Sequence, residues 1–78
     1  MYRITVYTAP GCPYCSRVKN YLKELGLKFT EVDVSRRPED AERLVRKTGQ
    51  TGVPVVEIGD QIVIGFDKEK IDKLLGVK

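Results

Sequence analysis

The stretch that decides the fold is residues 3–15, which read RITVYTAPGCPYC. Arg3 to Tyr7 is rich in β-branched and aromatic residues, which favour a strand, and the cluster from Thr8 to Gly11 breaks that strand. Pro13 suits the first position of a helix, because its fixed backbone angle matches the helix and its missing N–H would be unpaired there anyway. The stretch therefore predicts a strand that passes directly into a helix, with Cys12 at the junction.

The first helix is followed by a second strand and a second helix. The first helix carries apolar residues three and four apart and ends near Gly26. Leu27 to Val34 is apolar enough to predict a second strand. A second helix begins near Pro38, carries acidic residues in its first turns and stops at Gly49.

The last third of the chain predicts a hairpin and a helix. The apolar runs Val55 to Ile58 and Gln61 to Ile64 are separated by Gly59 and Asp60, a spacing typical of a tight antiparallel hairpin. Asp67 can cap a final helix, which ends at Gly76. The order β-α-β-α-β-β-α predicts an α/β fold with a mixed four-stranded sheet flanked by helices.

Composition sets further bounds on the molecule. The chain has 78 residues, and residues 1–78 are expected to form a single domain. A composition of 41% hydrophobic and 32% charged residues is typical of a globular protein. No segment is apolar enough to span a bilayer and the first ten residues lack a secretory pattern, so we expect a cytoplasmic protein without membrane contact. The net charge of +3 comes from intermixed acids and bases, without interleaved aromatic residues, so nucleic acid is not expected as a partner.

The absence of histidine leaves thiols, carboxylates and backbone groups to carry any chemistry. Cys12 is expected at a helix N-terminus, which stabilises a thiolate, and thiols so placed have pKa values of roughly 3.5 to 7.5 instead of about 8.5. Cys15 follows on the buried stripe of the helix, within the Cα separation of about 4.4 to 6.8 Å that a disulfide can bridge. The pair predicts thiol–disulfide exchange, with Cys12 attacking and Cys15 resolving.

Two other interpretations of this cysteine pair carry less weight. A structural disulfide across about four residues would stabilise the fold by only roughly 2 kcal/mol, and the cytosol would reduce it. A structural zinc site needs four ligands, and this chain has neither a second cysteine pair nor a histidine, so no metal ligands are assigned.

The chain resembles the glutaredoxin and glutaredoxin-like redoxin family, a branch of the thioredoxin fold, over essentially its whole length. The resemblance rests on three motifs in the family's order: Cys12-Pro13-Tyr14-Cys15 after Val6-Tyr7-Thr8, Thr51-Gly52-Val53-Pro54-Val55-Val56, and Gly65-Phe66-Asp67 before the last helix. It implies a thioredoxin-like fold and a redox-active disulfide that transfers electrons in cell redox homeostasis.

The resemblance also implies a set of substrate contacts. These are Pro13, Tyr14, Thr51, Val53, Pro54, Gly65 and Asp67. In the family, the proline that matches Pro54 is cis and the backbone at Val53 pairs with substrate like an added strand. The residues alone allow other interpretations: Pro54 as a trans proline opening an edge strand, Thr51 as a loop residue, Tyr14 as an exposed ring and Asp67 as a helix cap.

The reductant is left open by two departures from the family pattern. Glutathione-using members often carry a lysine three residues before the first cysteine and a Gly-Gly pair before the last helix; here these positions hold Ala9 and Gly65-Phe66. Glutathione is therefore a possible co-substrate, with no tightly bound cofactor expected. The Gly-Phe pair resembles redoxins that serve ribonucleotide reductase and are recharged by thioredoxin reductase.

Three functions from different classes follow. The leading one is a monomeric dithiol reductase of protein or glutathione-mixed disulfides, with the ribonucleotide reductase donor as its variant. The second is an iron–sulfur or metal carrier in which two chains each supply Cys12. The third is an interaction module in which the dithiol takes no part.

Overall fold

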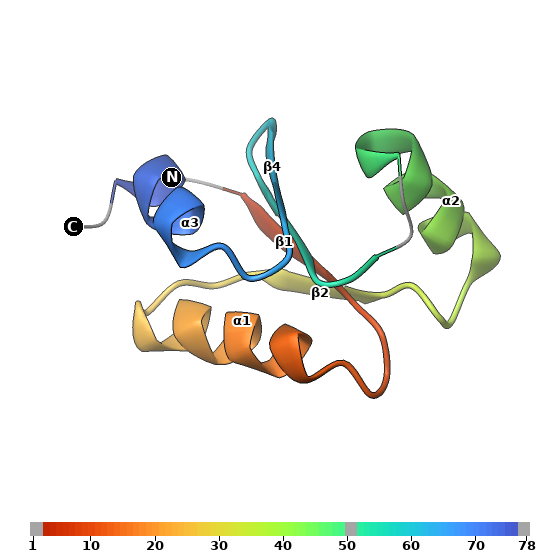
Figure 1. The fold of residues 1–78 in the computed structure, drawn as a ribbon, viewed down its shortest axis with the longest axis horizontal. Coiled ribbons are helices and arrows are strands. Elements are labelled where there is room, and N and C mark those ends of the chain that lie inside the picture. Colours follow the sequence, from red (N-terminus) through yellow and green to blue (C-terminus); the bar gives the residue numbers. More distant parts are fainter. Residues whose placement is uncertain (1–2, 50–51, 77–78) are drawn as a thin grey trace.

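The computed structural model describes residues 3–49 and 52–76, and their elements follow the predicted order. In chain order they are β1 (Ile4–Thr8), α1 (Pro13–Glu24), β2 (Thr30–Asp33), α2 (Pro38–Thr48), β3 (Val55–Ile58), β4 (Gln61–Ile64) and α3 (Lys68–Leu75). The strand order is β2-β1-β3-β4, with β1 parallel to β2 and the other pairs antiparallel (Figure 1). The predicted mixed four-stranded sheet is confirmed.

The two faces of the sheet carry separate cores, because neighbouring side chains of a strand point to opposite faces. Val6 of β1 packs in the larger cluster with Leu22 of α1 and Ile71 of α3. The next residue, Tyr7, packs in a smaller cluster with Leu44 of α2. Helices α1 and α3 therefore cover one face and α2 covers the other (Figure 1).

Helices α1 and α3 are also joined directly. The rings of Tyr21 and Phe66 lie with centroids 5.9 Å apart, and the Tyr21 hydroxyl donates a hydrogen bond to Asp72. The Asp72 carboxylate also pairs with Lys68 at 3.2 Å. These contacts hold the connection between β4 and α3 against the helix that begins at the cysteines.

The predicted turn and cap residues lie where the sequence placed them. Gly59 has a φ of +58°, in the left-handed region that a tight hairpin requires and that glycine adopts without strain. Asp67 caps α3, because its Oδ1 accepts the backbone N–H of Lys70 at 3.2 Å. Gly49 and Gly76 end α2 and α3 in left-handed conformations.

The bounds predicted for the first two strands were wrong. The second strand begins at Thr30 rather than at Leu27, because the Leu27 N–H donates to the Leu22 carbonyl at 3.0 Å and still closes the end of α1. Strand β1 runs one residue further than predicted, to Thr8, which pairs with Asp33. Gly26 closes the end of α1 as predicted, because it is left-handed with a φ of +74° and its N–H donates to the Lys23 carbonyl at 2.9 Å.

None of the helices within residues 3–49 and 52–76 has the length and apolar content that a membrane span needs.

Candidate active site

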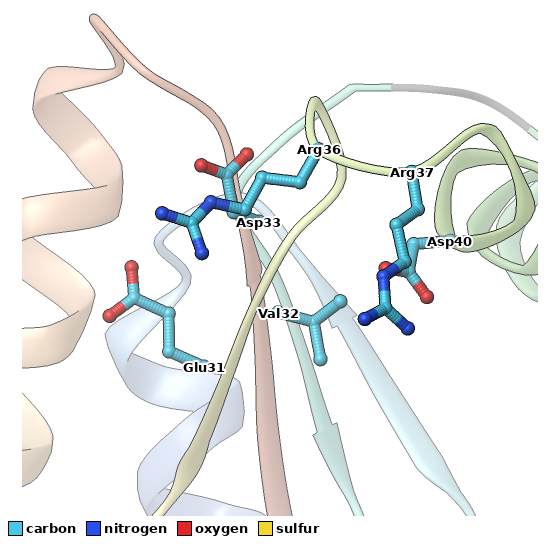
Figure 2. Close-up of a pocket in the computed structure, with 6 residues that line it drawn as sticks. All are labelled: Glu31, Val32, Asp33, Arg36, Arg37 and Asp40. Atoms are coloured by element: carbon cyan, nitrogen blue, oxygen red, sulfur yellow. The ribbon is translucent and has the colours of Figure 1, made fainter.

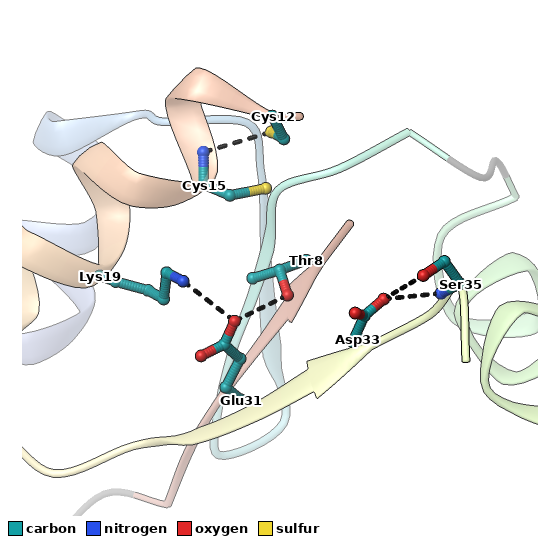
Figure 3. A network of polar contacts seen from close by, with 7 residues as sticks. All are labelled: Thr8, Cys12, Cys15, Lys19, Glu31, Asp33 and Ser35. Carbon is teal, nitrogen blue, oxygen red and sulfur yellow. Dashed lines mark hydrogen bonds and ion pairs between the residues drawn. The ribbon is translucent and has the colours of Figure 1, made fainter. Parts of the chain in front are cut away.

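Cys12 occupies the N-cap of α1, directly before Pro13 at the first helical position. Its backbone is extended, with φ −96° and ψ 106°, and its Sγ accepts the backbone N–H of Cys15 at 3.2 Å (Figure 3). Unpaired N–H groups at a helix N-terminus favour a negative charge, and here one of them points at the sulfur. The predicted position of Cys12 at the strand-to-helix junction is confirmed.

Cys15 lies in the first turn of the same helix but is buried, with 2% of its surface exposed. Val18 and Leu22 continue the buried stripe, as the helical spacing predicts. Both cysteines are free thiols. Burial raises the pKa of Cys15 to about 11, and its contact with Cys12 acts in the same direction. One thiol is therefore accessible, and its neighbour is shielded and kept protonated.

The segment before β3 completes the surroundings of Cys12. The Val53–Pro54 peptide bond is cis, as the resemblance implies, and Pro54 is buried. The Cys12 thiol donates to the Val53 carbonyl at a sulfur–oxygen distance of 3.8 Å, 41 residues away in sequence. The Gly65 N–H donates to the Pro54 carbonyl at 2.8 Å, so the turn after β4 is attached to the same segment.

The remaining residues that were predicted to contact substrate have no described contact with the two thiols. Pro13 and Tyr14 lie on the exposed start of α1, where Tyr14 is 55% exposed and the Arg17 guanidinium sits 5.4 Å from its ring centroid. Asp67 is exposed, and its described hydrogen bond is to its own helix. Thr51 lies outside the described residues. The structure thus brings Cys12, Cys15, Val53, Pro54 and Gly65 together.

A polar cavity of about 230 Å³ lies beside the thiols and was missed by the sequence analysis. Its charged lining residues are Lys19 of α1 and Glu31 and Asp33 of β2, and both cysteines line it as well. Glu31 Oε2 accepts from Lys19 Nζ and from the Thr8 hydroxyl, each at 3.0 Å (Figure 3). The Lys19 ammonium holds the pKa of Glu31 below its usual value.

A signal for this cavity was present in the sequence. Lys19 follows Cys15 by four residues, which places both on one helix face. In β2, Glu31 and Asp33 alternate with the apolar Val32, so period-two alternation places both carboxylates on the opposite face from Val32.

A second, larger hollow of about 510 Å³ lies at the outer edge of the sheet, against β2. Arg36, Arg37 and Asp40 line it together with Glu31, Val32 and Asp33 (Figure 2). Neither thiol lines this hollow. It adjoins the reaction centre only through Glu31 and Asp33, which line both spaces.

The chain is similar to known proteins in sequence and in fold. The family model described as Glutaredoxin matches residues 4–63. A glutaredoxin-like 8.6 kDa protein in the rubredoxin operon of Clostridium pasteurianum is 39% identical over 72 residues, covering 92% of this chain and 96% of that protein. A mutant of a thioredoxin-like protein superposes with a TM-score of 0.90 at 35% identity, over the whole of both chains. The NrdH-redoxin of Escherichia coli superposes with a TM-score of 0.82 at 39% identity, over 92% of this chain and 93% of that one.

The fold, the N-capping thiol and its shielded neighbour define a small thioredoxin-fold thiol–disulfide oxidoreductase. Within that class the family match and the relatives agree. The chain belongs to the glutaredoxin family.

Proposed function

We propose that this protein reduces disulfides of other proteins, or mixed disulfides with glutathione, through Cys12 attack and Cys15 resolution. The observation that supports this most directly is the position of the Cys12 sulfur, which accepts an N–H at the start of α1 while lying 3.8 Å from the Val53 carbonyl. A nucleophile so placed is stabilised as an anion and reachable from outside. A substrate strand laid against the Val53 backbone would present its disulfide to that sulfur.

The reaction proceeds in two exchanges. The Cys12 thiolate attacks one substrate sulfur, so that a bond from Cys12 to the substrate forms, the substrate disulfide breaks and one thiolate leaves. The Cys15 sulfur then attacks Cys12, the Cys12–Cys15 disulfide forms and the second substrate thiolate leaves. Two electrons pass from the dithiol to the substrate disulfide.

The assignment of the two roles is tested with single substitutions of the two cysteines. Insulin reduction is followed by turbidity with dithiothreitol as the terminal reductant. Cys12→Ser should lose activity by about a hundredfold or more, because the nucleophile is gone. Cys15→Ser should accumulate a mixed disulfide, visible by mass spectrometry as one substrate thiol per chain. Parent-level activity in folded Cys12→Ser would reject the proposal.

A second candidate is the electron donor to ribonucleotide reductase, recharged by thioredoxin reductase. It is favoured by the likeness to the NrdH-redoxin of Escherichia coli, a glutaredoxin-like protein described as having a thioredoxin-like activity profile. It is favoured also by Ala9 and by Gly65-Phe66, which stand where glutathione-using relatives often have a lysine and a second glycine. In either case the partners are disulfide-containing proteins in a reducing compartment such as the cytoplasm, and the chain acts as a monomer.

The two candidates are separated by the reductant. The oxidised protein is mixed with glutathione and glutathione reductase, or with thioredoxin reductase alone, and NADPH oxidation is followed. If Ala9 weakens glutathione binding, Ala9→Lys should raise the glutathione-dependent rate by several-fold, because it supplies a cation for the glutathione carboxylates. Ala9→Gln is the matched control, with a long side chain but no charge. Equal rates for the two variants would contradict the role given to position 9.

A further inference from the structure

The second exchange poses a problem that the dithiol alone does not solve. Cys15 must lose its proton before its sulfur can attack, yet the thiol is 2% exposed. Taking a charge out of water is costly unless an opposite charge compensates. Cys12, the nearest polar partner, is tied up in the mixed disulfide at that stage. A compensating positive charge must therefore come from elsewhere in the cavity, beyond the backbone hydrogen bond that Ala9 gives to Cys15.

Lys19 is the cation among the described residues that line this cavity. It lies one helical turn after Cys15, so both side chains lie on the same side of α1. Its ammonium is held at the cavity by Glu31 at 3.0 Å, and only 26% of the lysine side chain is exposed. An ammonium so placed favours ionisation of the neighbouring thiol. A backbone hydrogen bond at Ala9 and, after it, the charge of Lys19 both act to lower the pKa of Cys15.

The other groups that face the cavity do not offer a positive charge. Asp33 of β2 accepts from the backbone N–H of Ser35 at 2.9 Å and from the Ser35 hydroxyl at 2.6 Å (Figure 3). Thr8 of β1 is neutral and donates to Glu31. Glu31 and Asp33 are anionic and would oppose a thiolate at Cys15.

We propose that Lys19 changes partner during the second exchange. Its ammonium pairs with Glu31 in the resting dithiol and turns toward the Cys15 sulfur as that sulfur becomes a thiolate. The proton of Cys15 leaves through the open cavity to solvent, the Cys15–Cys12 bond forms, and the substrate thiolate departs from Cys12. This inference rests on the proposed function, since it concerns the resolving step of that reaction.

The proposal gives the two halves of one ion pair opposite effects. Lys19→Met removes the cation and should slow resolution. Glu31→Gln removes the competing anion and leaves the ammonium free to serve the thiolate, so resolution should be at least as fast as in the parent. A pair that only braced the fold would show the same direction of effect in both variants.

The experiment uses an aromatic disulfide, dithiobis-nitrobenzoate, whose released thiolate is coloured. Each reduced chain releases one coloured thiolate on Cys12 attack and a second on Cys15 resolution, so stopped-flow absorbance separates the two rates. At neutral pH, Lys19→Met should slow the second phase by about three- to tenfold, since one nearby charge is lost. The first phase should stay within about twofold of the parent, because Cys12 keeps its N–H contact with Cys15.

The pH profile gives a readout that bracing alone would not move. The rate of the second phase should rise with pH as Cys15 ionises, and Lys19→Met should move that rise to higher pH. At sufficiently high pH the two rates should converge. Lys19→Arg should restore the parent profile, because it restores the charge.

Lys47→Met and Glu57→Gln are the matched controls. Lys47 and Glu57 form a comparable ion pair at 2.7 Å on the opposite face of the sheet, so both variants should leave both phases unchanged. A second phase unaffected in folded Lys19→Met would overturn the proposal. So would a second phase slowed in Glu31→Gln, which would identify the Glu31 carboxylate as a proton acceptor instead. Loss of the first phase in the parent would reject the proposed function itself.

Discussion

Each face of the sheet carries a polar network of the same kind, in which a strand hydroxyl and a helix lysine both contact one glutamate, but the surroundings of the two networks differ. On one face, the Thr8 hydroxyl donates to Glu31 at 3.0 Å, and Lys19 of α1 pairs with that carboxylate at 3.0 Å. On the other, the Tyr7 hydroxyl donates to Glu57 at 3.4 Å, and Lys47 of α2 pairs with it at 2.7 Å. Each of these two polar networks joins β1, a neighbouring strand and a helix.

The two polar networks differ in the part of the protein that each one faces. The Lys19–Glu31 pair opens on the cavity that holds Cys15, whereas Lys47 and Glu57 belong to the α2 face, which carries no cysteine. Adjacent residues of one strand, Tyr7 and Thr8, therefore begin two networks of matching chemistry. The role proposed for the Lys19–Glu31 pair therefore depends on its neighbours, since the two ion pairs are of similar length, 3.0 and 2.7 Å.

The largest expected difference between the faces concerns their cores. Leu22→Ala should lower the free energy of unfolding by about 3 to 4 kcal/mol, because it opens a cavity in the larger cluster. Leu44→Ala should cost about 2 to 3 kcal/mol, because α2 can settle toward the sheet and partly fill the space. Urea denaturation of the reduced protein, followed by circular dichroism, measures both. A greater loss in Leu44→Ala would reverse the comparison.

The next effect is a pH dependence that Cys15 gives to the thiol face. The folded-state pKa of Cys15 is raised from 9.0 to about 11, so the folded protein holds this proton where the unfolded chain releases it. The resulting stabilisation is fully present below pH 9 and is lost as the pH rises toward 11. Unfolding of parent and Cys15→Ala across this range should show a steeper decline in the parent. Parallel curves would contradict the pKa shift.

The hydroxyl groups should have smaller effects of unequal size. Thr8→Val removes a 3.0 Å hydrogen bond and should cost about 1 kcal/mol of unfolding free energy. Tyr7→Phe removes contacts of 3.4 Å to Glu57 and Lys47 and should cost about 0.5 kcal/mol. Thermal denaturation at neutral pH ranks them. Equal losses would mean that the longer contacts are as strong as the shorter one.

The ion pairs themselves should contribute least to stability. Lys19→Met and Lys47→Met should each cost about 0.2 to 1 kcal/mol, since partly exposed pairs are screened by water and salt. The cost should shrink when the salt concentration is raised. Denaturation at low and high salt tests this. A large, salt-independent loss in Lys19→Met would instead indicate a structural role for that pair.

Much of the fold could be predicted because local signals and global packing agree. The strand–turn–helix around Cys12, the Gly59-Asp60 hairpin and the caps at Asp67 and Gly76 each depend on a few neighbouring residues. The strand before Thr30 was overpredicted because Leu27 and Phe29 are apolar. They pack against the larger core from a connecting segment, so burial there does not require sheet pairing.

The site was predicted only where a motif carried it. Cys12 and Cys15 follow from their spacing and helix position, whereas the cis form of Pro54 came from the family resemblance alone. The Lys19–Glu31 contact joins residues 12 apart in different elements, and lone charged residues are most often solvated. The contact between Lys19 and Glu31 depends on the sheet register, which places Glu31 beside Val6 on the face under α1.

The attachment of α2 has a consequence for local unfolding. Of its described residues only Leu44 is fully buried, whereas α1 buries Cys15, Val18 and Leu22. Backbone amides of α2 should therefore exchange with deuterium through local openings. Those of β1 and α1 should exchange only when the whole protein unfolds. The hollow of Figure 2 spans this boundary, because β2 lines one side of it and the other side is lined by Arg36, Arg37 and Asp40, the last of which lies in the first turn of α2. The thiols thus lie on elements expected to exchange slowly, whereas the hollow beside them is bounded on its α2 side by a helix expected to open more readily.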